Sequence, residues 1–235
     1  MHSLRETEAV FFDLDDTLYD QLTPFQLALE HCRIDLANTK VEDVFKKVRY
    51  FSDVLWKVHI RGEISLDLLR IERIRCAFND FGLSLSNQRA SEVQERYEFE
   101  QQQINPFPDV LKIIKDLQSR KLIVGVLTNG PVQHQMNKIK SLQIDQIIPP
   151  ERIFISDGIG IAKPDKRVFE YVQRQINIES NKCCYIGDTW ENDVVPPIEA
   201  GWTSIWFNHR KRKPQSNHIP LETIMSYDNF MLKLP

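Results

Sequence analysis

Four aspartates in two short segments of the chain could carry nucleophilic, acid–base or metal chemistry. Asp13 and Asp15 stand in the stretch "DLDDT", and Asp188 and Asp193 stand in "GDTWEND". If the fold brings them together, two unit charges about 4 Å apart repel by about 4 kcal/mol at an effective dielectric constant of about 20. One lysine, Lys163, does not balance four carboxylates. A hard divalent cation is the natural counter-charge, and Mg²⁺ suits a site that also receives phosphate; a proton trapped between carboxylates is the alternative.

Each candidate residue follows a short apolar run that is typical of a buried strand. The runs at 9–12, 122–127, 153–155 and 183–186 show no polar alternation, which favours strands covered on both faces. Helical patterns separate the later runs, so we expect a parallel sheet with flanking helices. Ligands of such sheets bind beyond the carboxyl ends of the strands. Thr128 and Asn129 follow the second run and Lys163 lies beyond the third, so we expect all of these residues to converge.

Residues 20–104 interrupt the strand pattern with helical patterns alone. Apolar residues in 41–60 follow helical spacing, and "TPFQ" predicts a capped helix start with Thr23 as the cap. Two prolines in "NPFPDV" mark the return to alternating strands and helices. The predicted fold class is α/β: a Rossmann-like parallel sheet core with flanking helices, formed by residues 1–19 and 105–235, plus an inserted all-helical cap domain at 20–104.

Bulk composition argues against several classes of protein. The chain has 235 residues, of which 42% are apolar, and a formal net charge of −3, so neither disorder nor binding to a nucleic acid polymer is expected. Neither a signal peptide nor a membrane partner is expected, because no apolar run approaches the ~20 residues of a bilayer span. The four cysteines have no metal-site spacing, so we expect a reducing, cytoplasmic setting, with buried thiols at Cys183 and Cys184. A monomer is plausible, and the oligomeric state stays open.

Four motifs stand in order along the chain: "DLDDT" at 13–17, "LTNG" at 127–130, "AKPD" at 162–165 and "GDTWEND" at 187–193. This ordered set resembles the haloacid dehalogenase (HAD) superfamily of hydrolases. The motifs anchor the core across residues 9–208, and the helical block at 20–104 is similar to the cap that such enzymes carry after the first motif. The wording "FDLDDTLYD" resembles the branch of small-molecule phosphatases.

The resemblance implies roles for the four aspartates. Asp13 would be the nucleophile that attacks phosphorus and becomes an aspartyl-phosphate. Asp15 would protonate the leaving alkoxide and then deprotonate the hydrolytic water. Mg²⁺ would be held by Asp13, the backbone carbonyl of Asp15 and Asp188, with Asp193 orienting this shell.

The resemblance also implies a phosphate-binding set. The hydroxyl of Thr128 and the backbone N–H of Asn129 would hold the phosphoryl oxygens. Lys163 would neutralise both the nucleophile and the phosphate, a catalytic as well as a binding role. Because the transferring group spreads negative charge over its oxygens, positioning and electrostatics should supply most of the catalysis.

The function implied is hydrolysis of small-molecule phosphate monoesters, of the nucleoside monophosphate or sugar phosphate class, by a Mg²⁺-dependent phosphatase. Asp15 favours phosphate chemistry, because the dehalogenases of this superfamily lack an acid at that position. One alternative is a phosphotransferase or phosphomutase that returns the phosphoryl group to an acceptor. A second is a non-catalytic, metabolite-sensing module that retains the fold. The sequence does not identify the substrate or the cap residues that select it.

Other polar residues are given structural roles. Asp16 is interpreted as a helix or turn cap, and the basic run "NHRKRKPQSNH" at 208–218 as a solvated loop. Trp190, inside the fourth motif, could line the entry or pack under the loop, and both alternatives stay open. His134 follows the second motif, where contact with phosphate is conceivable, although a structural or surface role is favoured.

Overall fold

The computed structural model describes residues 6–228 and residue 230, and these form two compact units. The first, here called the core unit, comprises the chain up to Asp20 and from Ile104 onward. The second, the helical unit, comprises Gln21–Gln103. Each is described by itself. Among the described residues, no helix is both long and apolar enough to cross a bilayer.

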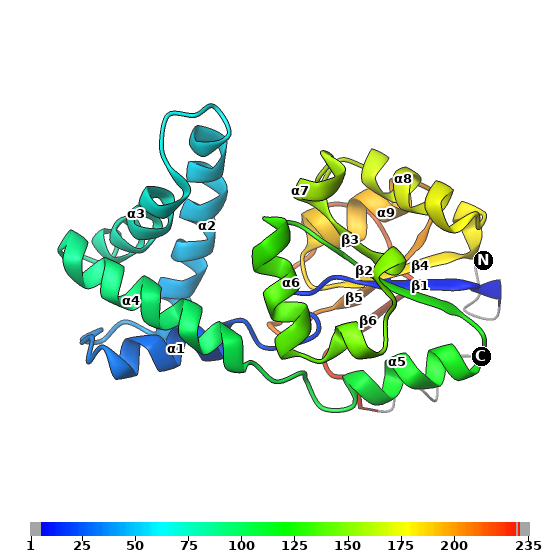
Figure 1. Ribbon diagram of the computed structural model, residues 1–235, viewed down its shortest axis with the longest axis horizontal. Coiled ribbons are helices and arrows are strands. Elements are labelled where there is room, and N and C mark those ends of the chain that lie inside the picture. Colours follow the sequence, from blue (N-terminus) through cyan, green and yellow to red (C-terminus); the bar gives the residue numbers. More distant parts are fainter. Residues whose placement is uncertain (1–5, 229, 231–235) are drawn as a thin grey trace. The chain divides into compact units, whose positions relative to one another are not determined.

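The core unit is built on a parallel sheet of six strands, in the spatial order β3-β2-β1-β4-β5-β6 (Figure 1). Phe12, the last residue of β1, pairs with Val126 of β2 on one side and Ile186 of β4 on the other. The carboxyl ends of the three central strands therefore lie side by side, which confirms the predicted fold class. The strands span β1 Ala9–Phe12, β2 Ile123–Thr128, β3 Ile153–Ile155, β4 Cys183–Gly187, β5 Thr203–Phe207 and β6 Glu222–Ile224, and the last was not predicted.

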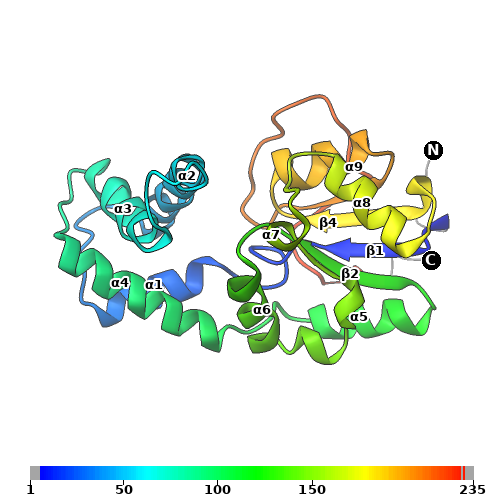
Figure 2. The same cartoon turned by 45° about the horizontal axis from the view of Figure 1, so that its top comes forward.

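Helices cover both faces of this sheet because β1 is apolar on both. Val10 and Phe12 pack with residues of α5 and α6, whereas Phe11 packs with residues of α8. Figure 2 shows α5 and α8 on opposite sides of the strands. The helices span α5 Val110–Ser119, α6 Val132–Ser141, α7 Ser156–Ile159, α8 Arg167–Ile176 and α9 Val195–Glu199, with a π-helix at Trp190–Val194 directly before α9.

The helical unit consists of four helices around its own apolar core, with α2 against α3 and α1 against α4. Phe25, Phe45 and Phe78 are among its buried side chains. Ser65 and Ser86 cap α3 and α4 by accepting from backbone N–H groups. The helices span α1 Leu22–His31, α2 Val41–His59, α3 Leu66–Asn79 and α4 Asn87–Glu100.

The predicted cap at Thr23 was wrong. Helix α1 begins at Leu22, so Thr23 lies inside its first turn, and the residue at the cap position is Gln21, whose side chain makes no capping bond. Pro24 still falls within the first turn, where a missing N–H leaves no helical bond unmade. The sequence pattern predicted the helix correctly. Its start lies earlier than predicted because Leu22 and Phe25 pack into the apolar core of the helical unit.

Candidate active site

Three buried aspartates and one buried lysine meet beyond the carboxyl ends of β1 and β4. Asp13 directly follows β1, Asp188 directly follows β4, and Asp193 lies in the π-helix that comes next. One carboxylate oxygen from each aspartate lies within 4.8 Å of the others, and all three side chains are buried. The Lys163 ammonium donates to Asp13 Oδ1 at 2.7 Å and to Asp193 Oδ1 at 2.6 Å. These four predicted residues therefore share one site.

The π-helix is held so that Asp193 points back at the strands. Asp193 Oδ2 accepts from the backbone N–H of Thr189 at 2.8 Å, and its carbonyl accepts from Ser204 Oγ at 2.8 Å. A Cβ atom at Gly187 would lie 2.5 Å from the Cβ of Asp193. Only glycine therefore lets the aspartate approach the end of β4 this closely, which explains the glycine in the fourth motif.

The site carries more negative than positive charge. Burial is the main cause that raises the pKa of Asp13, and Asp193, Asp188 and Asp15 raise it further against the opposing effect of Lys163, to about 8. For Lys163, burial alone would lower the pKa, but Asp13, Asp193 and Tyr185 raise it well above its ordinary value. The lysine therefore stays charged, and its one positive charge does not offset the aspartates.

The donor set fits Mg²⁺. The group offers buried carboxylate oxygens and neither sulfur nor imidazole, and oxygen ligands are the ones that Mg²⁺ prefers. The three carboxylates lie close together beside a single lysine, so their mutual repulsion favours a further cation there. Asp13, Asp188 and Asp193 could thus hold the ion. The contribution predicted for the backbone carbonyl of Asp15 stays a prediction.

The side chain of Asp15 faces a different set of partners. Lys138 Nζ donates to Asp15 Oδ1 at 2.8 Å and to Oδ2 at 3.0 Å. Gln135 Nε2 donates to Oδ2 at 3.1 Å, and the Tyr19 hydroxyl donates to Oδ1 at 2.5 Å. The Asp15 carboxylate, with 17% of its side chain exposed, is therefore oriented by three side chains. An aspartate held in this way suits proton transfer at a fixed place.

Sequence reasoning missed Gln135 and Lys138. Both are buried on α6, together with Ile139 and with Leu142, which directly follows the helix. A signal was present, because positions 135, 138, 139 and 142 follow helical spacing and so share one face. Two polar residues on an otherwise apolar face indicate a buried polar partner.

The predicted phosphate-binding residues lie at the end of β2. Thr128 is buried, and its Oγ1 accepts from Gln135 Nε2 at 2.6 Å. The Asn129 side chain binds the backbone of Lys163 twice, donating to its carbonyl at 2.8 Å and accepting from its N–H at 3.0 Å. This pair of bonds ties the segment of Lys163 to the end of β2. Phosphate contact by the Asn129 backbone N–H stays a prediction.

Asp16 and the basic run differ from their predicted roles. Asp16 is fully buried with a φ of 58°, and both of its oxygens accept from the Arg210 guanidinium, at 2.7 and 2.9 Å. Arg212 donates to Asp188 Oδ2 at 2.7 Å. The run is a loop that is exposed at 211 and 213–217, as predicted, but two of its arginines bind buried acids, and Asp16 is not simply a turn cap. The excess of buried acid attracts these arginines, an effect that local sequence patterns do not contain.

Trp190 packs under its loop. It is 4% exposed, its Nε1 donates to Ser216 Oγ at 2.9 Å, and its ring lies 4.8 Å from that of Trp206. Of the two alternatives, packing is the one observed. His134 is half-buried on α6, and its contact with a ligand stays untested.

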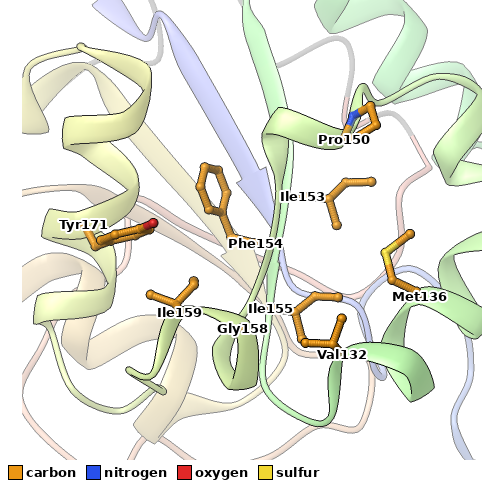
Figure 3. Close-up of a pocket in the computed structure, with 9 residues that line it drawn as sticks. All are labelled: Val132, Met136, Pro150, Ile153, Phe154, Ile155, Gly158, Ile159 and Tyr171. Atoms are coloured by element: carbon orange, nitrogen blue, oxygen red, sulfur yellow. The ribbon is translucent and has the colours of Figure 1, made fainter.

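An apolar hollow of about 300 Å³ lies elsewhere on the core unit, at the edge strand β3 (Figure 3). Val132 and Met136 of α6 line it together with Ile153, Phe154 and Tyr171. None of the predicted site residues is among those that line it. Helix α6 therefore presents an apolar face to this hollow and a polar pair, Gln135 and Lys138, to Asp15.

Comparison with known families decides the kind of enzyme. Residues 7–201 match the model of the haloacid dehalogenase-like hydrolases. The chain belongs to this family. Membership makes the protein a hydrolytic enzyme. The four motifs at the strand ends are therefore motifs of one hydrolase family.

Curated relatives of this hydrolase cover nearly its whole length. The pyrimidine 5'-nucleotidase YjjG of Escherichia coli is 24% identical over 232 residues, which cover 92% of this chain and 93% of the relative. A glyceraldehyde 3-phosphate phosphatase of Methanothermobacter thermautotrophicus is 25% identical over 228 residues, which cover 90% of each chain. These relatives are phosphatases of the same family.

Solved structures share the fold. The HAD-hydrolase YfnB of Bacillus subtilis, crystallised with magnesium, has a TM-score of 0.72 at 21% identity and covers 97% of this chain and 98% of its own. A dehalogenase complex has a TM-score of 0.80 at 16% identity and covers 98% of this chain and 99% of its own. At such identities the likeness concerns the fold alone.

Proposed function

We propose that this hydrolase cleaves small-molecule phosphate monoesters by way of an aspartyl-phosphate on Asp13. The observation that carries the proposal is the placement of Asp13, buried beside Lys163 and two further aspartates, with the Asp15 carboxylate held two residues away. Nucleotidase and sugar-phosphate phosphatase relatives support a phosphate ester as substrate. A nucleoside monophosphate or a sugar phosphate is the class that we favour.

The first chemical step transfers the phosphoryl group to the protein. A carboxylate oxygen of Asp13 attacks phosphorus, the bond from phosphorus to the ester oxygen breaks, and the leaving oxygen takes a proton from Asp15. Lys163 stays charged beside Asp13, so it offsets the negative charge that gathers on the phosphoryl oxygens. The Thr128 hydroxyl binds one of these oxygens.

The second step returns the enzyme to its starting state. Asp15 accepts a proton from water, the water oxygen attacks phosphorus, and the bond between phosphorus and Asp13 breaks to release inorganic phosphate. Asp13, Asp188 and the backbone carbonyl of Asp15 would hold Mg²⁺, with Asp193 orienting these groups, and the ion would supply positive charge near the phosphoryl oxygens. Because Asp15 is oriented by Lys138, Gln135 and Tyr19, it can serve both steps from one place.

A panel of phosphate monoesters tests the proposal. The purified protein is assayed with Mg²⁺ and with excess chelator, using nucleoside monophosphates, sugar phosphates and 4-nitrophenyl phosphate. Turnover should require Mg²⁺ and should fall on the order of 10⁴-fold or more in Asp13→Asn. Wild-type turnover in Asp13→Asn, or full activity in chelator, contradicts the mechanism.

A phosphotransferase or phosphomutase is the second candidate, since the same aspartyl-phosphate could pass its group to a sugar hydroxyl. Product analysis in the presence of an alcohol acceptor separates the two. A hydrolase yields inorganic phosphate as the main product, whereas a transferase yields a new phosphate ester. Absence of turnover across the panel, together with tight ligand binding, would favour a non-catalytic sensing module.

A further inference from the structure

A chain of hydrogen bonds on the inner face of α6 leads from Lys138 through Gln135 to Thr128. Lys138 Nζ donates to Gln135 Oε1 at 2.8 Å, and Gln135 Nε2 donates to Thr128 Oγ1 at 2.6 Å. All three residues are buried, with exposed fractions of 3% for Lys138, 1% for Gln135 and 1% for Thr128. Because these groups are buried, their donor and acceptor roles depend mainly on one another.

The direction of each bond follows from the ammonium group. A charged lysine has three donors and no acceptor, so the atom of Gln135 that faces Lys138 must be the carbonyl oxygen. The amide nitrogen then faces the other way, toward Thr128 and Asp15. In this orientation the amide nitrogen also donates to the Asp15 carboxylate whenever Asp15 is ionised. The Lys138 ammonium thus assigns the orientation of the Gln135 amide.

The orientation of the amide decides the polarity of the Thr128 hydroxyl. Because Thr128 Oγ1 accepts from Gln135, its own hydrogen cannot point at Gln135 and must be donated elsewhere. A phosphoryl oxygen is an acceptor and needs a donor. If the amide were reversed, the hydroxyl would donate to Gln135 and present lone pairs to the phosphate.

Gly130 leaves room for this arrangement. It has a φ of 135°, and a Cβ atom at this position would lie 3.3 Å from Gln135 Cγ and 3.4 Å from Cδ. A side chain at position 130 would therefore press on the amide that orients Thr128. This gives the glycine of the second motif a second task besides its backbone conformation.

We infer that Gln135, oriented by Lys138, is a positioning residue that holds the Thr128 hydroxyl as a hydrogen-bond donor toward the phosphoryl group. The inference rests on the proposed function, since it concerns the phosphate subsite of the same reaction. The strength of phosphate binding at Thr128 would then depend partly on helix α6, which follows the second motif.

A double-mutant cycle with inorganic phosphate tests the inference. Phosphate binding in Mg²⁺ is measured by titration calorimetry, and as competitive inhibition of 4-nitrophenyl phosphate cleavage, for the wild type, Gln135→Met, Thr128→Val and the double variant. Inorganic phosphate has no leaving group, so an effect of Gln135 through Asp15 chemistry does not enter. The exposed Gln133, two residues before Gln135 on the same helix, supplies the matched control Gln133→Met.

With Thr128 present, Gln135→Met should weaken phosphate binding about 3- to 10-fold, as expected for loss of one orienting hydrogen bond. With Val at position 128 there is no hydroxyl to orient, so the same substitution should change binding by less than about twofold. Equal factors in the two backgrounds overturn the inference, because a merely structural role of Gln135 would act without the hydroxyl.

A second substitution keeps the test decisive if Gln135→Met does not fold. Gln135→Glu retains an acceptor for Lys138 and turns the group that faces Thr128 into an acceptor. It should weaken phosphate binding by at least about 10-fold with Thr128 present and clearly less with Val at position 128. Additive effects overturn the inference here as well.

The assay also separates the inference from the proposed function. If the wild type turns over esters and Asp13→Asn does not, additive cycles contradict the role of Gln135 alone. If the wild type neither binds inorganic phosphate nor cleaves any ester, the proposed function fails, and the inference fails with it.

Discussion

The core unit and the helical unit bury different kinds of side chain. Among the described residues, the buried charged side chains of the core unit are Asp13, Asp16, Lys138, Lys163, Asp188 and Asp193, whereas that of the helical unit is Glu100. The helical unit instead carries ion pairs between exposed side chains one helical turn apart, as between Lys46 and Asp43 or between Arg89 and Glu92. Buried charge lowers stability unless it is paired, so its concentration at the strand ends indicates chemistry. The helical unit, by contrast, is organised around apolar packing.

The largest expected contrast concerns one lysine from each unit. Lys163→Met removes a buried ammonium and leaves Asp13 and Asp193 without it, so the free energy of unfolding should fall by about 3–5 kcal/mol. Lys46→Met removes an exposed partner of Asp43, with 67% and 45% of the two side chains exposed, and should change it by less than about 0.5 kcal/mol. Urea unfolding in chelator measures both. Similar losses would show that the two units do not differ in this respect.

The next effect is a pH dependence that belongs to the core unit. In chelator the pKa of Asp13 is raised from 3.8 to about 8, first by burial and then by the neighbouring aspartates, against the effect of Lys163. Between these pH values the unfolded chain loses this proton and the folded chain keeps it, so stability should fall as pH rises through the window. Thermal unfolding from pH 4 to 8 measures it. The Asp13→Asn variant has no titrating carboxyl at this position, so its stability should fall less as pH rises. If its stability depends on pH as steeply as that of the wild type, the account of charge at this site is contradicted.

A smaller effect should stay within the helical unit. Ser86 Oγ accepts from the backbone N–H of Arg89 at 3.2 Å, and Ser86→Ala should destabilise α4 by about 1 kcal/mol. Hydrogen exchange of the α4 amides should accelerate about fivefold, while amides of β1 and β4 stay as they are. Ser86→Asp retains a capping acceptor and should restore protection. Faster exchange in the core strands would show that the two units do not open independently.

The smallest effect concerns the cysteines, two in each unit. Burial raises the pKa of Cys183 and of Cys184 to about 12, so both should resist alkylation at pH 8. Cys32 and Cys76 are half-buried, and burial raises their pKa as well, but they should react first. Peptide mass mapping after iodoacetamide treatment gives the order, with the urea-unfolded chain as the control that labels at all four. If Cys183 is labelled early, strand β4 is more accessible to the reagent than its burial in this structure indicates.

Sequence patterns predicted the positions of the residues that directly follow the strands. The apolar run at 9–12 had to be a buried strand, so Asp13 had to lie at a carboxyl end, and the same reasoning brought Asp188 next to it. Asp193 followed because it stands in the same motif as Asp188, and Lys163 because its motif stands shortly after another strand, β3. Because the strands of the sheet are parallel, their carboxyl ends lie at one edge, and this alone predicted that these residues would come together.

The partners of the site residues could not be predicted in the same way. Lys138 reaches Asp15 across 123 positions of sequence, and Arg210 reaches Asp16 across 194. Such pairs depend on which side chains the excess of buried acid attracts once the chain has folded, and neither hydropathy nor spacing encodes that choice. Gln135 had a weak signal, as a polar residue on an apolar helix face, and it became interpretable only beside Thr128.

Capture of the phosphoryl group on Asp13 tests the central claim most directly. Asp15→Asn should still be phosphorylated by 4-nitrophenyl phosphate, whose leaving group needs little protonation, but should lack the base that activates water. In Mg²⁺, acid quenching and peptide mass mapping should therefore find one phosphoryl group on the peptide that contains Asp13, and the double variant Asp13→Asn, Asp15→Asn should show none. An unmodified Asp13 peptide during continuing ester cleavage, or a phosphoryl group on another residue, would contradict the account.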